Sequence, residues 1–411
     1  MTTASAAWQP PSGEPSRQSL WIISAPQDLL WFHGSVIAGL ALLLVFVGLP
    51  PLSDATYGVG HAAVWVLLLW GVIFDGTHVF GTYVRSYLAP AHDAVSRQAL
   101  PGAWSWTLVI LGPLLALIDA ALLPQRPSLL GQSGWLFQHF LLVAYLWAYW
   151  HLVRQHYGFL VLYQRRLGVR ERLDAVVLWA GSLYPYLRFA LGPEYLESGL
   201  PAVLPAAWLP SLRLGLDAVA ALGLVVVLAL YLRRFRTRRP GPAELLVAVV
   251  TGFHILVFAL LDNLLTITAT LTLFHNLQYH RIVWQYERGR GRTPAGGLLR
   301  YLALGLLLGG IWYGPRILGV AVTASPLVRN VLLGLGWGVA LHHYYVDGRI
   351  WRVRRQPQLA AALDRGGQEG LPGQTGQPGQ LGQTGQLGPG LSSAVTPAVS
   401  ATAATSVGAA P

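Results

Sequence analysis

The feature that most constrains the fold of this chain is the recurrence of long apolar stretches between residues 30 and 350. Each stretch is roughly 20 residues long, which is the length that an α-helix needs to cross the hydrocarbon core of a bilayer. Only 11% of the residues are charged, whereas soluble globular proteins average about 25%. The sequence therefore predicts an all-α protein, a polytopic integral membrane bundle of helices.

The basic clusters of the loops predict how many helices cross the membrane, because Arg gathers on the cytoplasmic side of membrane proteins. If residues 243–287 form two spans with a turn near Asp262 and Asn263, every cluster lies on one side. This solution gives about ten transmembrane helices in the inner (cytoplasmic) membrane, with both termini cytoplasmic. The expected spans are 30–49, 62–85, 103–123, 135–162, 174–191, 211–232, 243–262, 263–287, 297–318 and 326–347.

Three regions are expected along the chain. A polar N-terminal segment (1–28) precedes the transmembrane helical domain (29–355), and a disordered Gly/Gln-rich tail (356–411) follows it. Glycine recurs at every third position between 367 and 388, but the run is too short and too poor in proline for a collagen triple helix. Composition of this kind is typical of flexible chain, so the tail is expected to be dispensable for chemistry.

Composition also excludes several classes of function. The chain has no cysteine, which excludes thiolate metal sites, cysteine nucleophiles and disulfides. The net charge of +11 comes from Arg that flanks the spans, so the expected partners are the lipid bilayer and a lipophilic small molecule, with no nucleic acid. The sequence also lacks His-Glu-x-x-His, Gly-x-Ser-x-Gly and phosphate-loop signatures, and it has no His-x-x-His-His box of the desaturase kind.

Histidine carries the strongest chemical signal. In the expected topology, nine of the twelve histidines fall at the cytoplasmic edge of the membrane, and eight of these lie on or beside five separate spans. Buried imidazoles that come from separate helices are what a metal or haem centre needs, and polar groups inside a membrane usually mark function. The nine are His33, His78, His92, His151, His156, His275, His280, His342 and His343.

Two spans combine a histidine with a carboxylate on the same helical face. Asp75 and His78 are three residues apart, and His343 and Asp347 are four apart. A carboxylate in this position can orient a metal-binding imidazole through its second nitrogen, although a polar contact between helices would give the same pattern. His342 points about 100° away from His343 and is expected to be structural.

Two other spans each hold a pair of histidines five residues apart: His151 with His156, and His275 with His280. Five residues rotate an ideal helix by about 140°, so both members of a pair bind one metal only if a π-bulge intervenes. Without one, one histidine of each pair is expected to lie outside the centre. The alternative is that these histidines belong to the aromatic belt at the membrane surface, because tryptophan and tyrosine lie close to them in the sequence.

At these motifs the chain resembles the Brp/Blh-type β-carotene dioxygenase family. The resemblance rests on His33-Gly34, His156-Tyr157-Gly158, the FHNLQYH stretch that contains His275 and His280, and His343 followed by Asp347. That family consists of helical integral-membrane enzymes with a four-histidine iron that cleave a carotenoid to retinal. The resemblance implies His156, His275, His280 and His343 as iron ligands, with His33 or His78 in place of the first motif.

The preferred function is a membrane-embedded, metal-dependent oxygenase or oxidoreductase that acts on an isoprenoid or another lipid. Imidazoles beside carboxylates suit non-haem Fe(II), with Cu or Zn as alternatives. A transporter or proton-coupled carrier with a His/Asp relay, a haem protein with two histidine ligands and a structural subunit stay open. The candidate metal ligands are His33, His78, His151, His156, His275, His280 and His343, and the candidate catalytic residues are Asp75, Tyr279 and Asp347.

Overall fold

The computed structural model of the chain describes residues 20–48, 61–88, 100, 102–122, 135–192, 204–291, 297–322, 325–353 and 356–368. Within these ranges the regular structure is helical, and no strand is present. The elements are α1 (Ala25–Asp28), η2 (Leu29–His33), α2 (Val36–Gly48), α3 (His61–Trp70), η3 (Gly71–Asp75), α4 (Gly76–Arg85), η4 (Ala103–Trp106), α6 (Thr107–Leu122), α7 (Trp135–Arg166), α8 (Arg172–Ala190), η6 (Ala206–Trp208), α9 (Leu209–Phe235), α10 (Pro242–Leu260), α11 (Leu264–Gly289), α12 (Gly297–Val322), α13 (Pro326–Ile350) and α14 (Pro357–Gln368).

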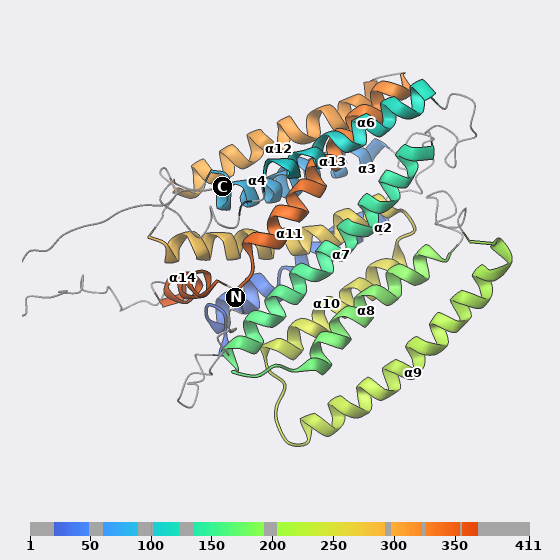
Figure 1. The fold of residues 1–411 in the computed structure, drawn as a ribbon. Helices are drawn as coiled ribbons and strands as arrows, with labels where there is room; N and C mark the ends of the chain where they lie inside the picture. The colour runs from blue at the N-terminus through green and yellow to red at the C-terminus, as the bar shows by residue number, and fades with distance from the viewer. Residues whose placement is uncertain are drawn as a thin grey trace, which may run out of the picture. The chain divides into compact units, whose positions relative to one another are not determined.

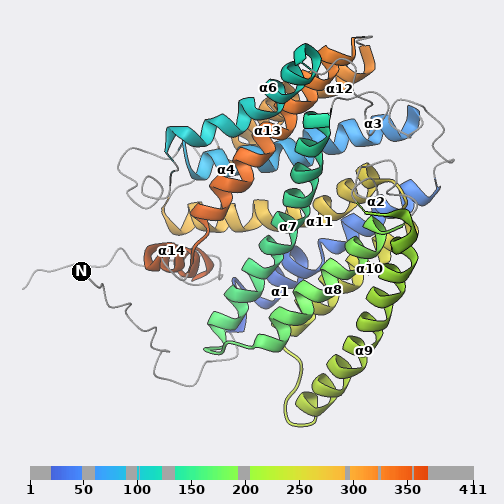
Figure 2. The same cartoon turned by 45° about the vertical axis from the view of Figure 1, so that its right-hand side comes forward.

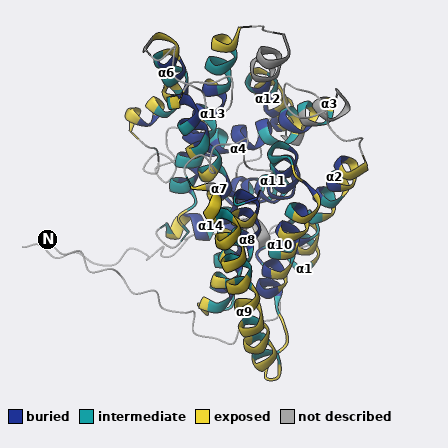
Figure 3. Ribbon diagram, turned by 90° about the vertical axis from the view of Figure 1, so that its right-hand side faces the viewer, coloured by how far each residue is buried: buried dark blue, intermediate teal, exposed yellow. Residues whose placement is uncertain are grey.

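In the part of the chain that the structure describes, each predicted span contains helix, so the all-α part of the prediction is confirmed. Five helices in the described part of the chain are long and apolar enough to cross a membrane. One of them, α9, buries none of its residues against the rest of the protein and exposes an apolar surface along its length (Figure 3). The five segments are Ala25–Gly48, Ala103–Ala121, Trp135–Arg166, Leu209–Phe235 and Pro242–Leu260.

The predicted break between the seventh and eighth spans is confirmed. Helix α10 ends at Leu260, and α11 begins at Leu264. Between them, the side chain of Asn263 caps α11 by accepting hydrogen bonds from the backbone N–H groups of Leu265 (2.9 Å) and Thr266 (3.3 Å). Asparagine is a preferred N-cap because it satisfies such free N–H groups, so the sequence itself sets the break.

The predicted disordered tail needs a correction at its start, because residues 357–368 form helix α14. The helix packs against α11 and buries the side chains of Leu359 and Leu363. The side-chain amide of Gln285 donates to the Leu363 carbonyl (3.2 Å). The apolar residues on one face of this segment are sufficient to pack it against α11. The prediction of disorder considered only the composition of the tail and not this face. Residues 369–411 lie outside the described part of the chain.

Helix α11 lies at the centre of the arrangement (Figures 1 and 2). It packs against α2, α4, α7, α10 and α14, and most of its side chains are buried. Helices α4, α7 and α13 meet around it, so residues that are far apart in the sequence share one interior. This central position explains why α11 is rich in buried polar residues: they can pair with several neighbouring helices instead of facing lipid or solvent.

Glycine allows two of these helix pairs to approach closely. A Cβ atom added at Gly309 on α12 would lie 2.4 Å from the carbonyl oxygen of Val72, beside the start of α4. On α13, a Cβ atom at Gly338 would lie 2.4 Å from the carbonyl oxygen of Val109 of α6. Gly305 with Gly309, and Gly334 with Gly338, repeat the small-xxx-small spacing of tightly packed membrane helices.

Candidate metal centre

Three buried imidazoles converge from three different helices. His78 of α4, His151 of α7 and His343 of α13 are each at most 4% exposed. Each offers one ring nitrogen, and these nitrogens all lie within 4.8 Å of one another. The Nε2 atoms of His78 and His343 are 3.0 Å apart. The structure therefore contains a buried histidine triad that could hold a metal ion.

The local backbone explains how His78 reaches this position. It lies one turn after η3, a π-helical turn between Gly71 and Asp75. A π turn inserts one extra residue into a helix and rotates everything that follows, and such turns are frequent at functional sites. In contrast, α7 and α11 stay α-helical through their histidine pairs, so no π-bulge brings both members of either pair to one ion.

The spacing of the triad fits the dimensions of a metal site. An imidazole whose nitrogen lies about 2.1 Å from an ion has its ring centre about 3.2 Å away, so two such rings are roughly 4.5–6.4 Å apart. The ring centres of His78 and His343 are 4.7 Å apart, and those of His151 and His343 are 5.3 Å apart. The buried Nε2 atom of His151 has no hydrogen-bond partner in the protein.

Asp347 anchors the polar side of the triad. Its carboxylate accepts hydrogen bonds from the Tyr279 hydroxyl (2.7 Å) and the Gln155 side-chain amide (2.7 Å). The nearest imidazole is that of His151, whose Nε2 atom lies 3.9 Å from Oδ2. The sequence paired Asp347 with His343 on its own helix, whereas the structure sets the carboxylate beside a histidine of another helix.

Tyr279 connects this carboxylate with the triad. Its ring lies 4.2 Å from that of His78 between centroids, and its hydroxyl also contacts the hydroxyl of Thr82 (2.6 Å). The indole N–H of Trp351 donates to the same phenol oxygen (3.3 Å). Four helical segments thus contribute to one hydrogen-bond network that holds Tyr279 and Asp347 at the edge of the centre.

Two further histidines are bound elsewhere by protein groups. Both ring nitrogens of His33 lie 3.0 Å from backbone carbonyl oxygens, those of Asp28 and Pro242. His280 contacts the hydroxyls of Thr77 (2.9 Å) and Tyr301 (3.0 Å). The structure therefore does not bring these two predicted ligands to the triad.

His342, predicted to be structural, also lies outside the triad. Its ring stacks on Trp106 at 4.2 Å between centroids, and its nitrogens contact the hydroxyls of Tyr83 (3.1 Å) and Tyr87 (3.3 Å). Burial raises the pKa of the Tyr87 phenol, so this partner is a neutral hydroxyl. The neighbouring histidines 342 and 343 consequently offer a matched pair for experiments, one outside the triad and one within it.

His156 and His275 lie next to the triad without belonging to it. The ring of His275 is 5.0 Å from that of His78, and the ring of His156 is 5.6 Å from that of His275. Both side chains are buried, the ring nitrogens of His275 have no hydrogen-bond partner in the protein, and the side chain of Gln278 lies next to the ring of His156. His92, the ninth histidine of the predicted edge, lies outside the described residues.

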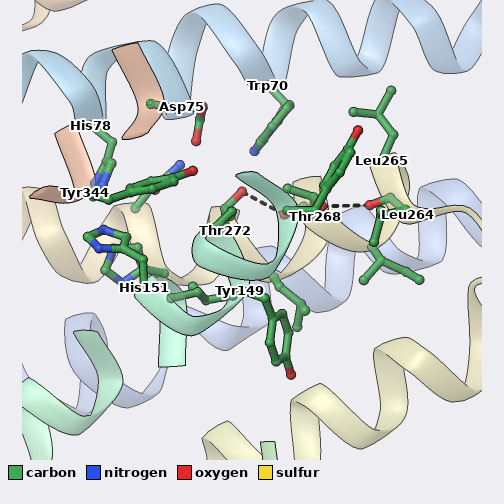
Figure 4. A pocket seen from close by; sticks show the side chains of 18 of the residues that line it. Trp70, Asp75, His78, Tyr149, His151, Leu264, Leu265, Thr268, Thr272 and Tyr344 are labelled. Atoms are coloured by element: carbon green, nitrogen blue, oxygen red, sulfur yellow. Dashed lines mark hydrogen bonds between the residues drawn. The ribbon is translucent and has the colours of Figure 1, made fainter. Parts of the chain in front are cut away.

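An apolar cavity leads to the triad. It is lined by His78, His151 and His343 at one end and follows one face of α11 from Leu264 to Asn276, a length of about 18 Å. Figure 4 shows His78 and His151 at one end of this cavity and Leu264 and Leu265 at the other. Asp75 also lines it and accepts a hydrogen bond from the Tyr313 hydroxyl.

A second cavity meets the first at His151, Gln155 and His275, which line both. It contains Asp347 and Tyr279 and continues past Arg154 and Arg352. The triad therefore lies between an apolar cavity and one with charged walls, close to the point where the two meet.

Neither a family model nor a curated protein nor a solved structure matches the chain.

Thr82 shares the helical face of Asp75 and His78 in the sequence, and the structure places its hydroxyl beside Tyr279 and Asp347. Sequence reasoning missed Gln155, because a glutamine in a span is more often a local helix contact. For His254 of α10 the sequence left open a place above the cluster or a hydrogen bond to another helix. In the structure it is fully buried, its Nδ1 atom lies 2.8 Å from the Tyr149 hydroxyl, and its ring lies 5.8 Å from that of His156. The small-xxx-small spacing on α12 and α13 was available in the sequence and indicates which helices approach most closely.

Proposed function

We propose that this chain is a membrane-embedded, metal-dependent oxidoreductase of the non-haem iron oxygenase class, which acts on a lipophilic substrate. The observation that carries the proposal is the buried triad of His78, His151 and His343 at one end of an apolar cavity. Imidazoles without thiolates suit Fe(II), and Cu and Zn are the alternatives. Bound iron with open coordination positions would supply the activation of O₂.

The chain's own residues account for substrate binding. Threonines 268 and 272 line the apolar cavity, but their hydroxyls donate back to the carbonyl oxygens of Leu264 (2.7 Å) and Thr268 (2.8 Å). Because both hydroxyl hydrogens are already donated, the two threonines offer no free donor to a substrate, and the face of α11 that lines the cavity behaves as an apolar surface. An elongated hydrocarbon, such as an isoprenoid or acyl chain, fits this wall and would lie with one end near the triad.

Asp347 and Tyr279 hold the polar side of the reaction site. The carboxylate lies 3.9 Å from Nε2 of His151, where its charge acts on the triad, and the phenol O–H donates to that carboxylate. Both groups also line the second cavity, whose walls include Arg154 and Arg352. The Tyr279 oxygen can therefore hold a proton at a position between the triad and this cavity. Groups placed beside metal ligands in this way can tune a metal site without binding the ion.

Membrane insertion, the ten-span topology and the cytoplasmic position of the termini belong to the same proposal. Five helices long and apolar enough to span a bilayer support it, as does α9 with its exposed leucines and valines. A lipophilic substrate could then enter the cavity from the bilayer. A transporter is less well supported, because its relay groups should be spread through the depth of the membrane, whereas these imidazoles converge.

Metal analysis of the detergent-purified protein tests the proposal. We expect stoichiometric metal in the wild type, none at the triad in His343→Ala, and full retention in the matched control His342→Ala. Oxygen uptake with β-carotene, and separately with a C16 acyl lipid, should follow the metal content. Wild-type protein without stoichiometric metal, or His343→Ala with undiminished metal, would rule the proposal out.

A further inference from the structure

A polar group of side chains lies on the wall of the apolar cavity, one helical turn from the triad. It consists of Trp70, Asp75 and Tyr313, which all line this cavity. The Tyr313 hydroxyl donates a hydrogen bond to the Asp75 carboxylate, and the rings of Tyr313 and Trp70 are 6.0 Å apart between centroids. Asp75 is three residues before His78, which corresponds to about 4.5 Å along a helix axis.

The π turn η3 places Trp70 and Asp75 on the same side of their helix. Five residues rotate an ideal α-helix by about 140°, but a π turn joins residues five apart by a backbone hydrogen bond and so brings them nearly over one another. Gly71 leaves room for Tyr313, since a Cβ atom at this glycine would lie 2.6 Å from the tyrosine ring. Figure 4 shows the side chains of Trp70 and Asp75 extending from this helix into the cavity.

The Trp70 indole is a buried donor without an acceptor. Its side chain is 6% exposed, and its N–H donates to no group in the described part of the chain. Buried donors in native proteins are nearly always paired, so this N–H indicates an acceptor that a ligand supplies. A carboxylate has two oxygens that together accept several hydrogen bonds, and Asp75 can therefore accept from a ligand as well as from Tyr313.

We infer that Trp70 and Asp75 bind a hydroxyl group of the substrate, so that the preferred substrate is a long-chain alcohol, such as an isoprenoid alcohol, and not a plain hydrocarbon. A hydroxyl fits both partners, because its oxygen accepts from the Trp70 N–H while its hydrogen is donated to Asp75. An ether would satisfy Trp70 only, and an ionised carboxyl group would be repelled by Asp75. The inference rests on the proposed function for the reaction at the triad and adds the class of substrate.

Binding of three matched ligands to the full-length, detergent-purified protein tests this inference. Phytol, its methyl ether and phytane share one branched carbon skeleton, but the ether only accepts a hydrogen bond, and phytane neither donates nor accepts. In competition against tritiated phytol, the ether should bind about 2–12-fold more tightly than phytane. Phytol should bind more tightly than the ether by a larger factor, because hydrogen bonds to a charged acceptor are stronger.

Two substitutions separate the two contacts. Trp70→Phe keeps an aromatic ring beside Tyr313 but removes the N–H, so the ether should lose its advantage over phytane. Asp75→Asn keeps the volume, but its neutral amide accepts more weakly and can donate to an ether oxygen, so the preference for phytol over the ether should shrink. Trp179→Phe is the control, since Trp179 lines neither of the two cavities, and it should leave all three affinities unchanged.

Metal content, measured on the same samples, separates this inference from the proposed function. A wild type that prefers phytol but holds no stoichiometric metal would support the hydroxyl site and rule out the proposed function. A wild type that holds metal but binds phytol and phytane equally would overturn the hydroxyl site alone. Unchanged ligand preferences in Trp70→Phe, at a wild-type melting temperature that shows the variant is folded, would also overturn it.

Discussion

The imidazoles of His78 and His343 are 265 positions apart in the chain, and their Nε2 atoms lie 3.0 Å from each other. Two nitrogens that bind one ion at about 2.1 Å and at right angles are also about 3.0 Å apart. A hydrogen bond between two neutral imidazoles would give a similar distance. The two interpretations differ in what they predict for a variant.

Replacing His78 by alanine should weaken metal binding at the triad by more than the roughly 100-fold that loss of an outer hydrogen bond can cost. The reason is that one of only three converging nitrogens is removed. Competition with a chelator of known affinity measures the change. His280→Ala is the control, since both nitrogens of His280 contact protein hydroxyls. Equal metal affinity in His78→Ala and the wild type would indicate that the contact is only a hydrogen bond.

The network around Asp347 is expected to tune the site without binding the ion. In Asp347→Asn the side chain keeps its volume but loses the charge beside His151 and one acceptor. We expect metal affinity and turnover to fall by about 10–100-fold. Tyr279→Phe, which removes the phenol that donates to Asp347, should lower turnover while metal is retained. These effects are measured by chelator competition and by oxygen uptake.

A carboxylate outside the site provides the control for this network. Asp119 is buried and accepts from the backbone N–H groups of Leu136 (3.1 Å) and Phe137 (2.7 Å) at the start of α7. Asp119→Asn should lower the melting temperature but leave the metal content per folded chain unchanged. An equal loss of metal in both asparagine variants would mean that Asp347 acts only through stability.

The sequence predicted the helices of this protein better than it predicted the site. Runs of about 20 apolar residues can be recognised in the sequence alone, and each run contains a helix in the structure. An apolar segment long enough to cross a membrane can make its backbone hydrogen bonds there only within itself, as a helix does. The break at Asn263 was also readable, since asparagine is a common N-cap. Helix α14 was missed because its apolar face is short and adjoins low-complexity chain.

The site required distances between helices, which the sequence does not contain. Helical spacing placed Asp347 on the face of His343, but the carboxylate lies nearest to His151 of another helix. Neither pair with a five-residue step meets at one ion: His151 belongs to the triad and His156 does not, whereas His275 and His280 both lie outside it. Which member of each pair turns inward depends on how the helices are rotated, and that follows from the packing around α11.

The apolar cavity gives a prediction that separates substrate binding from metal binding. Thr272→Val should keep activity near the wild-type level, because the hydroxyl of Thr272 is already occupied by the Thr268 carbonyl and valine has almost the same shape. Thr272→Trp should fill the cavity and raise KM or abolish turnover, with metal content unchanged. Full activity of Thr272→Trp would show that the substrate does not use this cavity.

The glycines of α12 predict a contrast between adjacent positions. A Cβ atom at Gly309 would clash with the backbone of Val72 at 2.4 Å, whereas one at Gly310 meets nothing within 4 Å. Gly309→Ala should therefore separate α12 from the helix that carries His78, and it should lower both the melting temperature and the metal content. Gly310→Ala should be neutral or slightly stabilising, because alanine is favoured over glycine in a helix by about 0.5–1 kcal/mol. Similar melting temperatures for the two variants would contradict the packing.

Arg234 joins the ends of α8, α9 and α10, and its replacement is expected to destabilise the fold. The Arg234 guanidinium lies 2.7 Å from the carboxylate of Asp174 and 2.6 Å from that of Glu244, and these two side chains are 1% and 4% exposed. Arg234→Met would leave two buried carboxylates with less compensation, at a cost of about 3 kcal/mol. Thermal unfolding in detergent should show this as a clear drop in melting temperature, while Arg233→Met, at an exposed neighbouring position, should change little. Because none of these three side chains lines either cavity beside the triad, the metal content of folded Arg234→Met should equal that of the wild type, and a selective loss of metal would show that the two regions are coupled.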